Sequence, residues 1–371
     1  MKLLLINAVC GIRSTGRICV DIAEQYEKDG YDVKIAYGRE NVPKQYEKYA
    51  VKIGGNADVY AHALGHKLFD NRGAYSKSAT KKFLEWADEF DPDILWLHNL
   101  HDFYINIKLL FGWIKSRPNM QVKWTQHDCW AFTGGCYHYQ ISKCNKWQSK
   151  CDSCPKVSSS RGIFLKTKKN FELKKKLFCG IKNMTLITPS YWLREEVQKS
   201  FLKEYPIEVV HNKIDLNVFK PTEGDFRKRY GLEGKTIILG VASAWSKEKG
   251  LDDFIKLSTM LDDGKKIVLV GLKKEQMKNV PESILVIPRT NNAKELAEIY
   301  TTSDVFLNLT YEDTYPTVNL EAQACGTPVI TYKTGGSPES VPTENVVECG
   351  NLEEIVEKLK SIKILKVNTD F

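Results

Sequence analysis

The sequence predicts an α/β protein built from two doubly wound domains. Short β-rich segments alternate with helical patterns, and this alternation is typical of parallel strands joined by crossover helices. The alternation begins again at TIILGVA (236–242), after a polar connector that contains Pro206 and Pro221. The length of 371 residues also exceeds what one hydrophobic core usually supports, so about two domains are expected.

The predicted strands are short runs rich in Val, Ile and Leu. In the first half they lie at 3–9, 32–38, 93–99, 122–128 and 184–190. In the second half they lie at 236–242, 266–271, 283–288, 304–309 and 328–332. We place the junction near residues 206–220. The predicted parts are an N-terminal domain over 1–207, a C-terminal domain over 208–350 and a final helix over 351–371. One large α/β domain with an insertion is the alternative.

The composition is that of an ordinary globular protein, with 42% hydrophobic and 27% charged residues. No apolar run approaches the roughly 20 residues that a transmembrane helix needs. We interpret the N-terminal MKLLLINAV as a buried strand and not as a signal peptide, because Asn7 interrupts it and no small-residue cleavage site follows. These features predict a cytoplasmic protein whose cysteines are free thiols or metal ligands before they are disulfides.

The segment DTYPTVNLEAQACGTPVI (313–330) follows the predicted strand at 304–309. Within it, TVNLEAQA predicts a helix, and Gly326 and Pro328 end that helix before the next strand. The loop that carries the first acid therefore lies at the carboxyl end of a strand, where doubly wound sheets bind their ligands.

Two acids frame this turn from loop to helix. Asp313 lies in the loop, and Glu321 lies about one and a half turns inside the helix. The backbone N–H groups of Thr317 and Val318, together with the helix dipole, can hold phosphate oxygens between the acids. For each acid alone, the alternative is a helix-capping carboxylate or a solvated helix residue.

With these motifs, the sequence resembles the retaining glycosyltransferases of family 4. The spacing of the two acids carries the resemblance, although Asp313 stands where the family usually has Glu. The other matching segments are VHNKIDLNVFKP (210–221), GVASAWSKEKGLDDFI (240–255), ACGTPVI (324–330) and TYKTGGSPE (331–339). The resemblance implies the GT-B fold, in which two Rossmann-like domains face a central cleft.

The resemblance also implies roles for individual residues. Glu321 would bind the nucleotide ribose, Asp313 the hydroxyls of the donor sugar, and Lys249 the diphosphate. The family usually has an Arg six residues before Lys249, where this chain has Ser243, and Lys247 is the expected replacement. A solvated loop lysine is the alternative for Lys247. The further residues expected to bind the donor are Gly16, Arg289, Thr290, Thr317 and Val318.

Histidines follow two predicted strands of the first half. By the resemblance, His127 would touch the donor sugar, and a hydrogen-bonded core histidine is the alternative. We expect His98, Asn99 and His101 to shape the acceptor site, with structural roles as the alternative. Asp128 can orient His127 or cap a loop.

Five of the ten cysteines lie within residues 129–155. The pair Cys151-x-x-Cys154 has the spacing of a zinc knuckle, so we expect one structural zinc ion and no catalytic metal. The expected ligands are Cys136, Cys144, Cys151 and Cys154. The reserve ligands are Cys129 and His138. Free cysteines are the alternative.

Residues 156–182 contain nine Lys or Arg and one Glu, interleaved with Phe and Leu. Such a segment can contact an anionic membrane, where each basic residue contributes about 1 kcal/mol. A solvated helix with one buried face is the alternative.

Two classes of function fit these observations. The first is a metal-independent enzyme that moves a sugar from a nucleotide-sugar donor to a glycan or lipid-linked acceptor, with retention of anomeric configuration, in polysaccharide biosynthesis. It would act in the cytoplasm, at the inner face of the membrane, without a nucleic-acid partner. The second is a zinc-stabilised, basic nucleic-acid-binding protein without catalytic activity. This second class leaves the two doubly wound halves and the paired acids unexplained.

Overall fold

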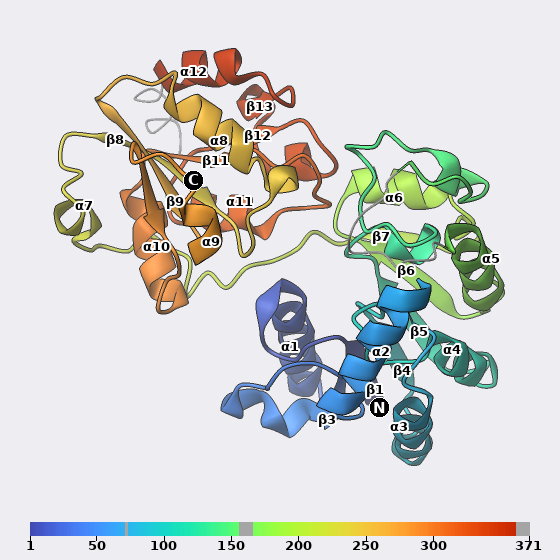
Figure 1. The fold of residues 1–371 in the computed structure, drawn as a ribbon. Coiled ribbons are helices and arrows are strands. Elements are labelled where there is room, and N and C mark those ends of the chain that lie inside the picture. The colour runs from blue at the N-terminus through green and yellow to red at the C-terminus, as the bar shows by residue number, and fades with distance from the viewer. Residues whose placement is uncertain (71–72, 156–165, 361–371) are drawn as a thin grey trace. The chain divides into compact units, whose positions relative to one another are not determined.

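The computed structural model describes residues 1–70, 73–155 and 166–360. The chain divides into two compact units, Met1–His211 and Asn212–Phe371, each with its own parallel sheet (Figure 1). The described residues thus confirm the predicted α/β class and the presence of two doubly wound halves.

The first unit is built on a parallel sheet with the strand order β3-β2-β1-β4-β5-β6-β7. Its strands are β1 (Lys2–Asn7), β2 (Asp32–Tyr37), β3 (Ala50–Lys52), β4 (Ile94–Leu97), β5 (Gln121–Thr125), β6 (Met184–Thr188) and β7 (Ile207–Val209). Its helices are α1 (Arg13–Lys28), α2 (Asn56–Phe69), α3 (Lys77–Phe90), α4 (Ile107–Lys115), α5 (Thr167–Phe178) and α6 (Tyr191–Gln198). The direction of the strand order changes between β1 and β4, which is where such sheets bind ligands.

The second unit has the strand order β10-β9-β8-β11-β12-β13. Its strands are β8 (Thr236–Val241), β9 (Lys265–Val270), β10 (Ile284–Ile287), β11 (Val305–Asn308), β12 (Val329–Tyr332) and β13 (Val346–Val347). Its helices are α7 (Phe226–Arg229), α8 (Leu251–Ser258), α9 (Lys274–Met277), α10 (Ala293–Thr302), α11 (Thr317–Ala324) and α12 (Leu352–Lys360). The switch point lies between β8 and β11. Residues 361–371, the end of the predicted final helix, lie outside the described residues.

All ten predicted strands are present, with ends that shift by up to three residues. The sequence prediction missed β3, β7 and β13. Each of these is two or three residues long and lies at an edge of its sheet, so it buries too little surface to leave a clear hydrophobic pattern.

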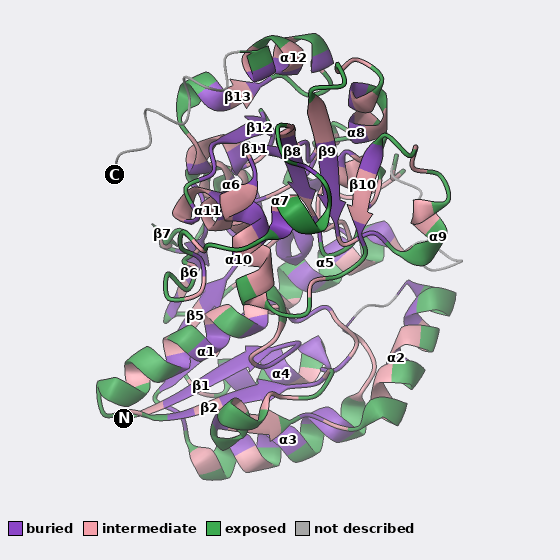
Figure 2. Cartoon of the chain, turned by 90° about the vertical axis from the view of Figure 1, so that its left-hand side faces the viewer, coloured by how far each residue is buried: buried purple, intermediate pink, exposed green. Residues whose placement is uncertain are grey.

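The central strands are buried on both faces. Leu3–Ile6 of β1 have no exposed surface, and the helices beside the strands expose only their outer faces (Figure 2). Burial on both faces explains why the N-terminal segment is apolar without alternation. Polar caps start several helices, since Asn106, Ser190 and Asn292 each accept a hydrogen bond from the amide three residues later. In the described part of the chain, no helix is both long and apolar enough to span a bilayer.

Candidate functional site

In the second unit, an ion pair joins the two loops at the switch point. The ammonium of Lys249, in the turn that follows β8, lies 2.9 Å from Oδ2 of Asp313, in the loop that follows β11. The same ammonium donates a longer hydrogen bond of 3.4 Å to the hydroxyl of Thr310. The side chains remain 38% and 22% exposed, so both can reach a ligand. The structure thus brings together two residues that lie 64 positions apart in the sequence.

Two glycines make this close approach possible. Gly250 has a φ of +74°, and a Cβ atom there would lie 2.2 Å from the carbonyl oxygen of Leu309. Gly335 has a φ of +51°, and its Cβ would lie 1.8 Å from the carbonyl oxygen of Asp313. That carbonyl also accepts a 3.2 Å hydrogen bond from the amide of Gly336. The loop that carries Asp313 is therefore held on two sides by backbone contacts that a side chain would block.

Glu321 lies on α11 and is held by a tyrosine of α10. The hydroxyl of Tyr300 donates a 3.2 Å hydrogen bond to Oε2 of Glu321. Burial, and then the charge of Glu321, raise the pKa of Tyr300 well above its usual value, so the phenol stays a neutral donor. Asn319 anchors the same helix, because its amide group bridges Asn308 and Ser340 at 2.8 Å each. The sequence analysis missed these four supporting residues, Tyr300, Asn308, Asn319 and Ser340. Their only signal is a polar side chain at a position that should be apolar.

The N-terminus of α11 is close to its predicted position. The helix begins at Thr317, and Pro316 is the cap residue and not part of the first turn. Thr317 and Val318 are half-buried, and their amides belong to the first helical turn, which has no acceptors within its own helix. An anion could therefore be bound there.

The other predicted donor residues lie at the carboxyl ends of their strands. Lys247 is exposed on the turn that carries Lys249, and Ser243 is exposed before it. Arg289 is exposed and Thr290 is half-buried just after β10, two strands from β8 in the sheet. Neighbouring strands lie about 4.8 Å apart, so these two residues start roughly 10 Å from the turn after β8.

In the first unit, two predicted histidines form a pair. Nδ1 of His98, after β4, lies 2.9 Å from Nε2 of His127, after β5, and the rings are stacked with centroids 5.2 Å apart. Burial, and then His127, lower the pKa of His98 well below its usual value. Burial likewise lowers the pKa of His127 to about 4, although Asp128 opposes the change. Both imidazoles are therefore neutral at physiological pH.

A third histidine, His101, lies next to this pair and carries a charge. Nε2 of His101 lies 2.9 Å from Oδ2 of Asp128, and its Nδ1 lies 3.3 Å from Oδ1 of Asp102. Burial alone would lower the pKa of His101, but the two carboxylates outweigh burial and raise it to about 9. The other oxygen of Asp128 accepts a 2.8 Å hydrogen bond from the amide of Trp130. Asp128 therefore orients His101, and it also caps the loop that follows it, which was one of its two expected roles.

These contacts change the interpretation of the predicted acceptor residues. His98 and His101 are only 2% and 7% exposed, so they face protein groups more than solvent. This burial favours the structural alternative for both. Asn99 is half-buried, and its amide donates to the side chain of Asn7, a fully buried residue at the end of β1. Asn7 is the supporting residue of this half that sequence reasoning did not identify.

Gly16 lies inside α1 and not in the turn before it. A Cβ atom at this buried position would lie 3.0 Å from Cγ2 of Val9 and 3.2 Å from the amide nitrogen of Gly11. Gly16 therefore allows α1 to approach the turn that precedes it. The sequence analysis expected Gly16 to allow the approach of a ligand instead.

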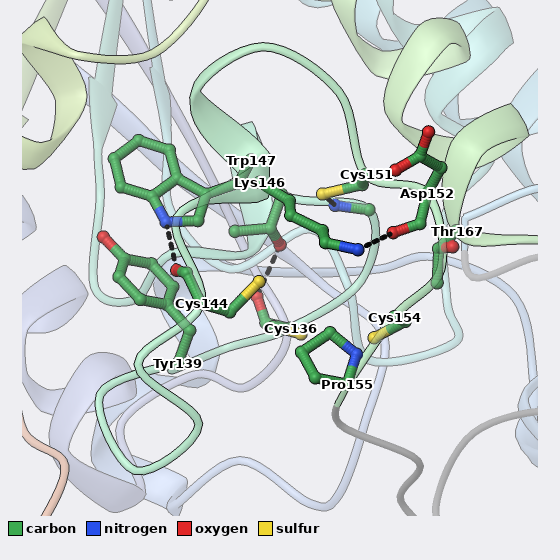
Figure 3. A pocket seen from close by; sticks show the side chains of 12 residues that line it. Cys136, Tyr139, Cys144, Lys146, Trp147, Cys151, Asp152, Cys154, Pro155 and Thr167 are labelled. Atoms are coloured by element: carbon green, nitrogen blue, oxygen red, sulfur yellow. Dashed lines mark hydrogen bonds between the residues drawn. The ribbon is translucent and has the colours of Figure 1, made fainter.

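The four cysteines proposed as metal ligands line one pocket, together with Lys146, Trp147 and Thr167 (Figure 3). None of the ten cysteines forms a disulfide. Burial raises the pKa of the Cys151 thiol, while the amide of Gly134 and the charge of Lys174 oppose this. Among the described residues, no three His, Cys, Asp or Glu side chains are arranged so that they could hold a metal ion.

The basic segment lies partly outside the described residues, because these resume at residue 166. On α5, Phe171, Lys174 and Phe178 are buried, and the remaining lysines of the helix are exposed. The aromatic residues of this helix thus pack into the unit, as in the alternative of a solvated helix with one buried face.

Two family profiles match the chain. The family described as "Glycosyltransferase Family 4" matches residues 15–218, and the family described as "Glycosyl transferases group 1" matches residues 223–366. The first match alone covers more than half of the chain.

Two curated relatives show the extent of the similarity. N-acetyl-alpha-D-glucosaminyl L-malate synthase of Bacillus anthracis is 29% identical over 204 residues, which are 50% of this chain and 52% of that protein. N,N'-diacetylbacillosaminyl-diphospho-undecaprenol alpha-1,3-N-acetylgalactosaminyltransferase of Campylobacter jejuni is 26% identical over 189 residues, 50% of this chain and 43% of that protein. The chain thus spans about half of the length of the curated relatives it matches.

Solved structures show the same fold over nearly the whole chain. Sucrose-phosphate synthase from Thermosynechococcus elongatus has a TM-score of 0.70 at 13% identity, over 99% of this chain and 90% of that one. HepE of Anabaena, solved in complex with UDP-glucose, has a TM-score of 0.64 at 16% identity, over 99% and 91% of the two chains.

Proposed function

The chain belongs to glycosyltransferase family 4 and has the GT-B fold, and from this premise we propose that it transfers a sugar from a nucleotide-sugar donor to an acceptor hydroxyl, with retention of the anomeric configuration. The observation that carries the proposal is the contact between Lys249 and Asp313 at the switch point of the second unit. Lys249 and Glu321 match motif residues of the family by the resemblance, and Asp313 stands at the position where the family usually has Glu.

In this proposal the ion pair is exchanged when the donor binds. Lys249 turns to the diphosphate, whose negative charge replaces that of Asp313, and the freed carboxylate accepts hydrogen bonds from hydroxyls of the donor sugar. The amides at the start of α11 bind a phosphate oxygen. Glu321, oriented by Tyr300, accepts hydrogen bonds from the ribose. The pair is partly exposed and worth about 1 kcal/mol or less, so the exchange costs little.

The chemical step breaks the bond between the anomeric carbon and the diphosphate oxygen. The acceptor oxygen bonds to the anomeric carbon on the same face of the sugar, and its proton goes to the departing diphosphate. No side chain is assigned as a nucleophile, and no divalent metal is assigned a role. The chain contributes by positioning the reactants and by stabilising the negative charge on the leaving group with Lys249 and the helix N-terminus.

His127 is the residue of the first unit that we assign to the donor sugar. Its low pKa keeps it neutral, so it can donate a hydrogen bond to a sugar hydroxyl without adding charge. The contact with His98 fixes the ring. His98 and His101 then act as positioning residues, since both are buried beside His127 and Asp128.

For the acceptor, we propose a glycan or lipid-linked sugar of polysaccharide biosynthesis, used at the cytoplasmic face of a membrane. The Campylobacter relative is named for a diphospho-undecaprenol acceptor, and WaaG, a structural neighbour, is described as involved in lipopolysaccharide biosynthesis. The surface of the first unit supports a membrane contact. Tyr60 and Leu64 of α2 are 76% and 60% exposed, and Phe69 at the end of that helix lies against the ammonium of Lys166, next to the lysine-rich α5.

The proposal is tested by measuring donor binding to the full chain. Native mass spectrometry against UDP-, GDP- and ADP-sugars identifies the donor, and calorimetry gives its affinity for Lys249→Ala, Glu321→Gln and the control Lys256→Ala, an exposed lysine of α8. We expect at least about a tenfold loss, or about 1.4 kcal/mol, in the first two variants and none in the control. Unchanged affinities, or a product with inverted anomeric configuration, would contradict the proposal.

A further inference from the structure

We propose that Cys136, Cys144, Cys151 and Cys154 bind one structural zinc ion in the pocket of the first unit shown in Figure 3. Each of the four thiols is partly exposed and free of a disulfide. The other six cysteines of the chain are spread over both units: Cys10, Cys19, Cys129, Cys179, Cys325 and Cys349. A single small pocket thus gathers four thiols that come from three separate turns of one loop.

The turn formed by Cys151 and Cys154 has the features of a metal knuckle. The amide of Gly134 donates a 3.1 Å hydrogen bond to the sulfur of Cys151. A Cβ atom at Gly134 would lie 2.7 Å from Cβ of Cys151 and 2.6 Å from the carbonyl oxygen of Thr167, so only glycine allows this approach. Backbone N–H groups aimed at sulfur stabilise the thiolate form, which is the form that binds metals.

Lysine side chains compensate the charge that such a site would carry. Four thiolates and one Zn²⁺ have a net charge of −2. The ammonium of Lys146, which lines the pocket, donates to the carbonyl oxygens of Asp152 and Ser153 at 3.3 and 3.0 Å, inside the knuckle. Lys174 is buried, donates to the carbonyl oxygen of Trp130 and lies 4.2 Å from the centre of its ring. Positive charge beside a thiol pocket favours thiolates over thiols.

The four cysteine ligands determine which metal ion can bind and whether it is structural or catalytic. Four thiolates in a tetrahedral arrangement suit zinc, or iron in an iron–sulfur site. A shell of four protein ligands leaves no open position for water or substrate, so the ion would be structural. Zinc–sulfur bonds of about 2.3 Å bring the sulfurs about 4 Å apart. The side chains line the pocket without forming this shell, so zinc binding must draw them together and order the loop.

The loop has a direct connection to the buried histidines. It follows Asp128 in the sequence, and the ring of His101 lies 5.4 Å from that of Trp130 and 4.7 Å from that of Tyr137. A zinc ion would therefore hold two aromatic rings against His101. The donor-binding residues Lys249 and Glu321 belong to the other unit, so the failure of one proposal does not imply the failure of the other.

The test is elemental analysis of the full chain, purified without added metal or chelator. We expect about one zinc per chain in the natural protein and less than about a tenth of that in Cys151→Ser/Cys154→Ser. Cys349→Ser, which removes an exposed cysteine of the second unit, is the matched control and should keep its zinc. Less than about a tenth of a zinc per natural chain, iron in place of zinc, or a disulfide among the four cysteines would overturn the proposal.

A second measurement covers the case in which the double variant fails to fold. The natural protein is stripped of zinc with a chelator and refilled with Co²⁺, whose absorption reports tetrahedral thiolate ligands. We expect that spectrum, with a thermal midpoint that falls on stripping and returns on refilling. An octahedral spectrum, or the thiolate spectrum in Cys136→Ser or Cys144→Ser at full intensity, would overturn the four-cysteine assignment and point to His138 or Cys129.

Discussion

The charged state of His101 gives a prediction that can be worked out in magnitude. In the folded protein its pKa is about 9, against an ordinary value of 6.5. At about 1.4 kcal/mol per pH unit, this difference corresponds to roughly 3 kcal/mol of stability. Because the folded pKa is the higher one, this contribution is complete below about pH 6.5 and is lost as the pH rises through 9. Asp128→Asn removes the negative charge that does most to raise the pKa of His101. It keeps a side-chain oxygen that can accept the hydrogen bond from the Trp130 amide.

Two measurements on the full chain check this reasoning. NMR of protein with ¹³C-labelled histidine should show one of the seven histidines titrating near 9, and Asp128→Asn should lower that value by more than Asp102→Asn does. Urea unfolding followed by tryptophan fluorescence reports mainly on the first unit, which holds seven of the eight tryptophans. Between pH 6.5 and 9.5, the unfolding free energy of the natural protein should fall by roughly 3 kcal/mol more than that of the Asp128→Asn variant. A His101 that titrates near 6.5, or equal losses in both proteins, would refute the assignment.

Three further predictions concern catalysis, backbone and surface. His127→Ala should lower kcat more than it lowers donor affinity. The size of this effect should not depend on pH between 6 and 8, because the ring is already neutral. An equal loss of free-nucleotide binding would indicate a structural role. Gly234→Ala should cost about 1 kcal/mol of unfolding free energy, and Gly250→Ala about 3, since both have φ near +75° but only Gly250 faces the carbonyl of Leu309. Equal losses in urea unfolding, followed by hydrogen–deuterium exchange of the amides of β8 and β11, would contradict this. Binding of the full chain to vesicles with anionic lipid should weaken as the salt concentration rises, because salt screens charges over a Debye length of about 8 Å at physiological ionic strength. Binding that does not depend on lipid charge would contradict the membrane contact.

The parts of the fold that could be predicted from the sequence are those in which local pattern and burial agree. The central strands are apolar runs because both of their faces are covered, and their order along the chain implies where the polar loops gather. The short edge strand β7 lies inside what looks like a polar connector, because three residues at a sheet edge need little apolar surface. Its existence depends on pairing with β6, which no local pattern reveals.

The candidate site could be predicted as a set of residues but not as a set of contacts. Asp313 and Lys249 were each identified by motif, while their ion pair depends on β8 and β11 being neighbours. His98 and His127 were assigned to different substrates, and the structure shows one stacked pair because β4 and β5 are adjacent. The state of His101 could not be predicted either, since it results from two carboxylates that converge on one buried ring.

In the part of the chain that the structure describes, the two units are joined once, at His211 and Asn212, and this has a consequence for how such a protein changes over evolutionary time. Every strand of each sheet comes from one uninterrupted stretch of the gene. A recombination event at this point can therefore exchange a whole half without cutting a hydrogen-bonded ladder or dividing a hydrophobic core. A lineage can in this way acquire a different second half, with its own ion pair and its own helix after the acidic loop, while it keeps the histidines and the cysteine loop of the first.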